Sequence, residues 1–109
     1  MREEPCKTYG HLFPADQHIA DAVGAVLSDW NIPECTELEG DIFRISFEGV
    51  FFPKDDVLDA LRTLLCTEST GKLDLIDMEA WTLTRAAFSG TEITVKTVGL
   101  NHVLAYSGH

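Results

Sequence analysis

Three acidic residues close together are the first candidates for chemistry in this chain. Asp74, Asp77 and Glu79 lie within six residues of one another, and in an extended segment Asp77 and Glu79 would point to one face, about 7 Å apart. Carboxylate oxygens at that separation suit a hard cation such as Mg²⁺, and two carboxylates can also divide general acid and base work. No glycine loop or histidine stands beside them in the sequence. We therefore favour a solvated strand edge, where acids discourage edge-to-edge pairing.

Histidines and cysteines are the other residue types that could form a site. The four histidines are His11, His18, His102 and His109. A transition-metal site would need two or three of them to converge in the fold, and we expect scattered surface positions instead. The three cysteines, Cys6, Cys35 and Cys66, are odd in number and far apart. That spacing favours reduced thiols over a disulfide framework or a zinc ribbon.

No motif of a known reaction class lies in the sequence. A nucleotide-binding loop, a nucleophile elbow and paired metal-binding cysteines are all absent. We therefore expect no catalytic residue, no cofactor and no resident metal. An enzyme is the less favoured interpretation, and the sequence shows no motif that identifies a family.

The charge of the chain is strongly negative. Eighteen acidic residues against eight Lys and Arg give a net charge of −10 over 109 residues. Direct binding to a phosphate backbone needs clustered basic residues, so we expect no direct nucleic-acid partner. Residues 32–40 form an acidic connector that we expect to be a mobile loop. Its acids, with the one that follows, are Glu34, Glu37, Glu39 and Asp41, and they either confer solubility or steer a basic partner.

Length and hydropathy predict one globular domain over residues 1–109. The chain is 45% hydrophobic, an ordinary value for a folded domain. Its first residues lack the apolar run of a secretion signal, and no stretch approaches the roughly 18 apolar residues of a membrane span. These patterns predict a cytoplasmic protein with no membrane partner.

Two segments have the apolar period of an amphipathic helix. The first begins at Pro14 and ends by Asn31, and its apolar face is closed by Trp30, which we expect to be buried. The second begins at Pro53 and ends by Gly71, after some fraying. The apolar face of the first comprises Ile19, Ala22, Val23, Val26, Leu27 and Trp30, and that of the second comprises Val57, Leu58, Leu61, Leu64 and Leu65.

Strand signals fill much of the remaining chain. Residues 43–52 alternate apolar and polar side chains, with a bulge or bend expected at Gly49. Residues 73–88 fit either a helix or a strand. The turn signal Ser89-Gly90 before the clear strand 91–98 favours a hairpin, with an irregularity near Asp77. Residues 7–13 add an edge strand, and 101–107 form either a short helix or a further strand.

These elements predict a two-layer α+β sandwich, with both helices on one face of an antiparallel sheet of three to four strands. The second face of such a sheet is open in part, and exposed aromatic residues there would anchor an interface. The leading hypothesis is a small acidic interaction module that binds a protein partner or itself and has no chemistry of its own. A small metal-dependent or acid/base enzyme using the Asp/Glu cluster, and a structural subunit of an assembly, remain alternatives. The candidate interaction residues are Trp81, Phe51, Phe88, Glu34, Glu37, Glu39 and Asp41.

Overall fold

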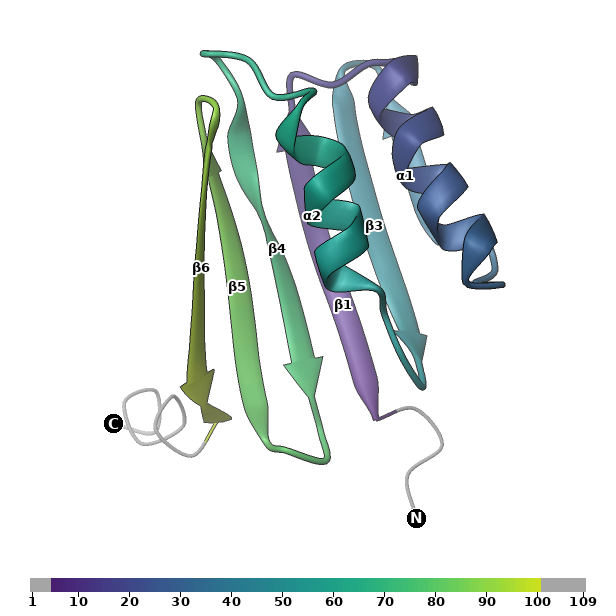
Figure 1. Ribbon diagram of the computed structural model, residues 1–109, viewed down its shortest axis with the longest axis vertical. Coiled ribbons are helices and arrows are strands. Elements are labelled where there is room, and N and C mark those ends of the chain that lie inside the picture. Colours follow the sequence, from purple (N-terminus) through teal and green to yellow (C-terminus); the bar gives the residue numbers. More distant parts are fainter. Residues whose placement is uncertain (1–4, 101–109) are drawn as a thin grey trace.

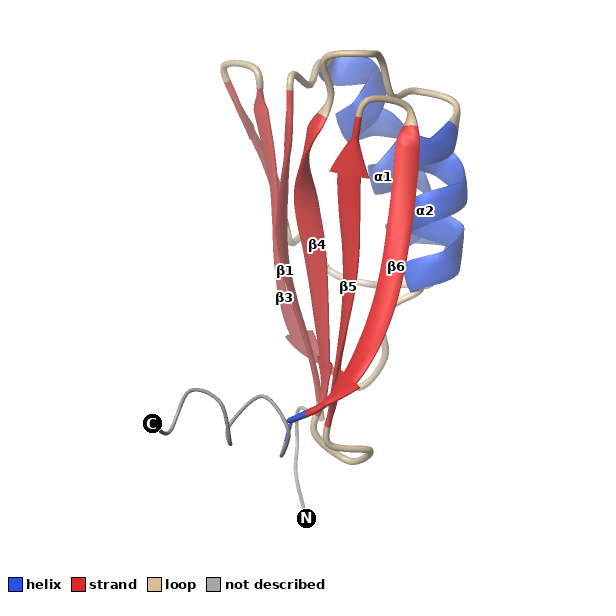
Figure 2. Cartoon of the chain, turned by 90° about the vertical axis from the view of Figure 1, so that its left-hand side faces the viewer, coloured by secondary structure: helices blue, strands red, loops and turns tan. Residues whose placement is uncertain are grey.

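The computed structural model describes residues 5–100, which form six strands and two helices. In chain order they are β1 (Cys6–Phe13), α1 (Gln17–Asp29), β2 (Thr36–Glu39), β3 (Ile42–Gly49), α2 (Lys54–Arg62), β4 (Thr70–Asp77), β5 (Thr82–Ser89) and β6 (Glu92–Gly99). All six strands belong to one antiparallel sheet, and both helices lie on the same side of it (Figures 1 and 2). The predicted α+β class is confirmed. The predicted count of three to four strands is wrong.

The order of strands in the sheet is β2-β3-β1-β4-β5-β6. β1 pairs with β3 along one edge and with β4 along the other. The first six elements are therefore two interlocked split β-α-β units, in each of which a helix joins two parallel strands that have a third strand between them. Because both of its edges are paired, β1 is a central strand, and the prediction of an edge strand at residues 7–13 is wrong.

Helix α1 begins where the sequence provides a cap. The carboxylate of Asp16 accepts a hydrogen bond from the backbone N–H of Ile19 at 3.1 Å, which satisfies one of the free donors of the first turn. Ile19, Val23 and Leu27 are the buried residues of this helix. The predicted periodicity is confirmed over most of its length, with the start at Gln17 rather than at the proline.

Helix α2 begins directly after Pro53 and carries Asp55 and Asp56 in its first turn, where carboxylates favour the positive end of the helix dipole. It ends at Arg62, well before the predicted terminator Gly71. That glycine lies inside β4, where an added Cβ would stand 2.1 Å from the carbonyl oxygen of His11. Gly71 therefore permits the close approach of β4 to β1 instead of ending the helix.

The core lies between the helices and the strands that they cover. α1 and α2 contribute Val23, Val57 and Leu61, each at most 2% exposed. The sheet contributes alternate residues of β3 and β1, including Phe43 and Leu12, which are also nearly inaccessible. This packing fixes which face of each strand is buried.

The region around residues 73–88 is extended, as favoured, but forms two strands instead of one. The irregularity predicted near Asp77 is the turn between β4 and β5. There the Asp77 carboxylate accepts the backbone N–H groups of Glu79 and Ala80, both at 2.9 Å, and Trp81 has a φ of 59°. The hairpin predicted at Ser89-Gly90 is confirmed, with Gly90 at a φ of 62° in a two-residue turn before β6.

Two further boundaries differ from the prediction. Residues Thr36–Glu39 form β2, so this part of the acidic connector is a strand paired with β3 and not a mobile loop. β3 ends at Gly49, so residues 50–52 are not part of the strand; of the predicted bulge or bend, the chain has a bend, at Val50 directly after the glycine. The predicted segment 101–107 lies outside the described residues.

Candidate protein-interaction site

Trp30 is exposed, although the helical period predicted its burial. It caps the C-terminus of α1 and is 48% exposed, because the helix ends one residue before it and the ring turns toward the loop after β3. There it packs on Phe51, with the ring centroids 5.0 Å apart. Phe51 is itself 52% exposed. The two rings form an aromatic pair at the protein surface.

The loop after β3 presents Phe51 because its neighbour is anchored in the core. Phe52 is buried, and its ring packs on that of Phe47 with centroids 5.5 Å apart. Phe51, the residue before it, lies at the surface against Trp30 instead. Val50, at the same loop, is 77% exposed.

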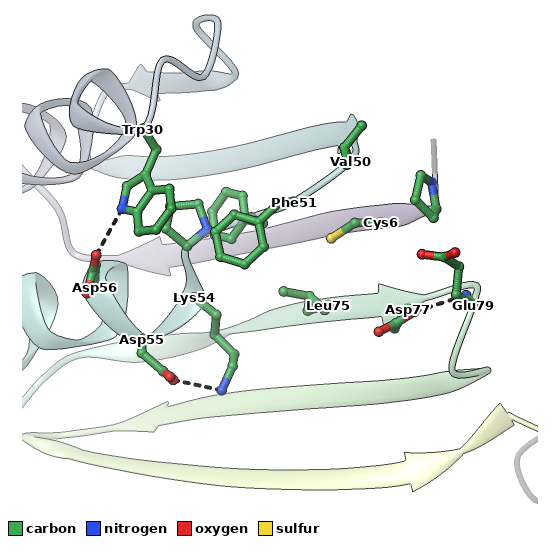
Figure 3. A pocket seen from close by; sticks show the side chains of 13 residues that line it. Cys6, Trp30, Val50, Phe51, Lys54, Asp55, Asp56, Leu75, Asp77 and Glu79 are labelled. Atoms are coloured by element: carbon green, nitrogen blue, oxygen red, sulfur yellow. Dashed lines mark hydrogen bonds and ion pairs between the residues drawn. The ribbon is translucent and has the colours of Figure 1, made fainter. Parts of the chain in front are cut away.

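A hollow of about 360 Å³ opens beside the aromatic pair. We call it the aromatic hollow. Figure 3 shows Cys6 and Leu75 between the aromatic pair and the acids Asp77 and Glu79. The residues that line the hollow thus come from four parts of the chain: the start of β1, the end of α1, the loop from β3 into α2, and the end of β4 with the turn after it.

The rim of the aromatic hollow is negatively charged. Its lining includes four carboxylates, Asp55, Asp56, Asp77 and Glu79, and one ammonium group, that of Lys54. Lys54 Nζ lies 3.0 Å from Asp55, and the indole Nε1 of Trp30 donates a hydrogen bond to Asp56 at 2.9 Å (Figure 3). The second bond holds the indole in place and satisfies its polar group, while its apolar surface stays accessible.

The acidic cluster predicted as a metal or acid/base site is divided by the sheet. Asp74 lies on the face away from the helices, where Arg85 donates to it through Nε at 2.7 Å and through a terminal nitrogen at 2.9 Å. Asp77 lies on the opposite face, and its carboxylate accepts a backbone hydrogen bond in the turn after β4. Glu79 lies in that turn, where the alternation of a strand no longer applies. Within residues 5–100 no group of three His, Cys, Asp or Glu is placed to hold a metal ion.

The other predicted interaction residues occupy different places. Phe88 is 5% exposed and belongs to the core, so its side chain is not at the surface. Trp81 is half-buried in the turn between β4 and β5, two residues after Glu79 of the rim. The acids of the connector lie on and beside β2, outside the lining of the aromatic hollow: Glu34, Glu37, Glu39 and Asp41. The carboxylate of Glu39 accepts a hydrogen bond from Arg44 at 2.8 Å.

The three cysteines are free. Burial raises the pKa of the Cys6 thiol, and the negative charge of Asp77 acts in the same direction. Burial also raises the pKa of Cys35, with a further contribution from Glu34. Because the thiolate is the nucleophile, raised pKa values disfavour a catalytic role for either thiol.

The face of the sheet away from the helices has a different charge pattern, which the sequence did not reveal. The strand register places five basic and five acidic residues on it: Lys7, Arg44, Lys72, Arg85, Lys96, Glu37, Glu39, Glu48, Asp74 and Glu92. Three of the bases lie within 4 Å of an acid of the same face, at distances of 2.8, 3.9 and 2.7 Å. Alternation along one strand shows which of its residues share a face, but the five bases of this face come from five different strands. The sequence does not show how those strands lie side by side.

This open face has a shallow hollow of its own, of about 770 Å³, which Tyr9, His11 and Asp74 help to line. The hydroxyl of Tyr9 donates a hydrogen bond to Glu48. Acids and bases are balanced here, whereas α1 and α2 carry mostly acids on their exposed surface. The aromatic hollow therefore differs from the open face in having both an apolar surface and an excess of negative charge.

Comparison of the chain with protein-family models, with curated proteins and with solved structures found no match. In the part of the chain that the structure describes, neither helix is long and apolar enough to cross a membrane.

Proposed function

We propose that the protein is an interaction module without chemistry of its own, which binds a partner protein through the aromatic hollow. The observation that carries the proposal is the exposed pair of Trp30 and Phe51, whose rings contact each other with their planes tilted by 43°. Large aromatic side chains at a surface with a hollow beside them are typical anchors of protein interfaces. Val50 enlarges the apolar surface on the same side.

The charge around the aromatic pair favours a particular kind of partner. Four carboxylates and one ammonium group line the hollow, so the local charge is negative. An apolar side chain flanked by Lys or Arg would fill the hollow and place its positive charges against the rim. We therefore propose a basic partner segment that presents one apolar anchor. On the open face, in contrast, three of the five bases lie within 4 Å of an acid of the same face.

A displayed library of random peptides, selected on the immobilised full-length protein, tests this proposal. We expect enrichment of peptides with an apolar residue between basic residues. Phe51→Ala should weaken the affinity of the best peptide by at least about tenfold, the usual loss at an anchor. Phe13→Ala is the matched control, because Phe13 is also exposed, at 40%, but lies outside the hollow. Peptides without basic residues, or binding that Phe51→Ala leaves unchanged, would overturn the proposal.

Association kinetics then identify the acids that attract the peptide. The rim variant Asp55→Asn/Glu79→Gln and the connector variant Glu34→Gln/Asp41→Asn remove the same number of charges. If the rim steers the partner, the first variant should lower the on-rate more than the second, and rising salt should reduce the difference between them. Equal on-rates for both variants would remove the rim from the proposal and leave the connector as the steering surface.

A further inference from the structure

β6 is an outer strand with a long free edge. Among the described residues no strand pairs with its outer side, and it runs for eight residues, whereas β2 at the opposite edge has four. Seven of the eight residues of β6 are exposed. A long exposed edge is a template for pairing with another strand unless charges or proline block it, and β6 contains no proline.

The hairpin turn determines which backbone groups face the free edge. Ser89 and Glu92 flank the two-residue turn and pair with each other, so they exchange both backbone hydrogen bonds. Because hydrogen-bonded and non-hydrogen-bonded pairs alternate along an antiparallel ladder, the backbone N–H and C=O groups of Thr94 and Lys96 also point toward β5. The backbone groups of Ile93, Val95 and Thr97 face outward, where a further strand would bind.

The sequence of β6 is complementary to itself about Thr94. It reads Glu92-Ile93-Thr94-Val95-Lys96. If a second copy pairs antiparallel with Thr94 opposite Thr94, Glu92 of each copy faces Lys96 of the other, and Ile93 faces Val95. The outward-facing residues 93 and 95 then form the hydrogen-bonded pairs. Glu92 and Lys96 fall in the non-hydrogen-bonded pairs, whose side chains are closer together.

Other registers lose this complementarity. In the joined sheet, residues opposite each other must have their side chains on the same face, so that the helices of both copies stay on one side. They must also both direct their backbone groups outward or both inward. Both conditions hold only if the centre of pairing lies on a residue, so it can move only by whole residues. With Val95 at the centre, Glu92 would face Val98. With Lys96 at the centre, two lysines would face each other, and like charges directly opposite one another are destabilising. Charge complementarity therefore selects the register centred on Thr94.

Within residues 5–100 of one chain, Glu92 and Lys96 have no residue of opposite charge as a partner. Across β5, Lys96 is paired with Arg85 and Glu92 with Ser89. Arg85 directs its guanidinium to Asp74 and away from Lys96. Neither Glu92 nor Lys96 forms an ion pair in the described part of the chain. A second copy would supply the missing partner to both.

We propose that two copies of this chain pair through their β6 edges, antiparallel and centred on Thr94, so that their sheets join into one. Such a contact is isologous, since each copy gives the same residues to it, and it closes with two-fold symmetry. Val95, which is 44% exposed in one chain, would lie against Ile93 of the other copy. The residues that line the aromatic hollow do not include β6, so this inference is independent of the proposed function.

Sedimentation equilibrium of the full-length protein over a range of concentrations tests the dimer. We expect a concentration-dependent dimer, which Glu92→Lys and Lys96→Glu each weaken by at least about tenfold, because each change sets two like-charged pairs opposite one another. An equimolar mixture of the two variants should dimerise at least as well as the original chain, since a mixed dimer regains both opposite-charge pairs. Val95→Pro, which removes an outward-facing N–H, should also prevent dimerisation.

Controls separate this contact from others. Arg62→Glu, on α2, makes the same change of charge as Lys96→Glu and should leave the dimer intact, and so should Phe51→Ala in the aromatic hollow. A monomer at every concentration up to about 1 mM would overturn the proposal. If Glu92→Lys and Lys96→Glu each still dimerise alone, and mixing the two variants does not strengthen the dimer, the proposed register is wrong. A dimer that Phe51→Ala abolishes would place self-association in the hollow and overturn the β6 contact.

Discussion

The part of the sheet under the helices and the β5–β6 hairpin belong to one continuous ladder but are stabilised differently. On the covered part, the face toward the helices carries large apolar side chains such as Phe43 and Leu12, which are almost fully buried. On the hairpin, the same face carries Thr84, Val95 and Thr97, and Figure 1 shows no helix in front of it. The difference teaches that pairing alone extends a sheet, while helix packing decides which strands form the core.

The hairpin joins the core through its first strand only. Ala86 and Phe88 of β5 are buried, with exposed fractions of 1% and 5%, whereas no residue of β6 is buried. β6 is attached by its backbone ladder and by side-chain pairs such as the hydroxyl groups of Thr84 and Thr97, 2.9 Å apart. Hydrogen bonds of this kind each contribute about 1 kcal/mol or less, so β6 should be less stable than β5.

Truncation of one apolar side chain in each region should give the largest contrast. Leu61→Ala removes a side chain that is 2% exposed between α2 and the sheet, and we expect it to lower the free energy of unfolding by about 2–5 kcal/mol. Val95→Ala, in the exposed strand, should cost less than about 1 kcal/mol. Urea unfolding of dilute protein measures both. Similar losses at the two sites would show that the hairpin is packed as tightly as the covered sheet.

Substitution of glycines should give the next largest change in stability. A Cβ at Gly10 would stand 2.4 Å from the carbonyl oxygen of Lys72 and 2.8 Å from Cα of Leu73, so β1 and β4 would have to move apart. We expect Gly10→Ala to destabilise the protein by about 1–3 kcal/mol. Gly24→Ala in α1 is the matched control. No atom outside the adjacent helix backbone lies within 4 Å of its added methyl group, and the better helix propensity of alanine should stabilise the chain by up to about 1 kcal/mol. Thermal unfolding gives the sign of each change, and a stabilised Gly10→Ala would contradict the tight β1–β4 approach.

The smallest expected effect is a pH dependence on the covered side. Because burial raises the pKa of Cys6 above its ordinary value of 9.0, the folded state retains this proton more strongly than the unfolded state. The resulting stabilisation is complete below pH 9 and is lost as the pH rises through the folded-state pKa. We expect Cys6→Ala to flatten the fall in unfolding free energy as the pH rises above about 9. Cys66→Ala, at an exposed thiol, serves as the comparison, and equal slopes for the two variants would contradict the prediction.

The sequence predicted the elements whose pattern is local. α1 has a capping aspartate and a three- and four-residue apolar period, and the Ser89-Gly90 turn lies between two clear strands, so both were found. β2 was missed because it has only four residues and two of them are glutamates. The central place of β1 could not be predicted, because nothing in its own residues states which strands lie at its two edges.

The candidate site was predicted only in part, for a related reason. Phe51 was proposed as an interaction residue, but its partner Trp30 fits the apolar stripe of α1 and was expected in the core. What decides its exposure is the end of the helix at Asp29, a boundary of one residue that periodicity does not resolve. The split of Asp74 from Asp77 likewise depends on the turn that begins directly after β4.

The central position of β1 also determines the order in which the molecule can fold. β1 is made before β4, one of its two neighbours in the sheet, so Cys6 cannot pair with Asp77 until β4 has been made as well. Pairing between such distant segments carries a large loop-closure entropy and is characteristic of slow folding, whereas β5 and β6 need only a two-residue turn to meet. During synthesis the four-strand layer under the helices therefore cannot close until β4 has left the ribosomal tunnel, and the edge of β1 that β4 will cover stays unpaired until then.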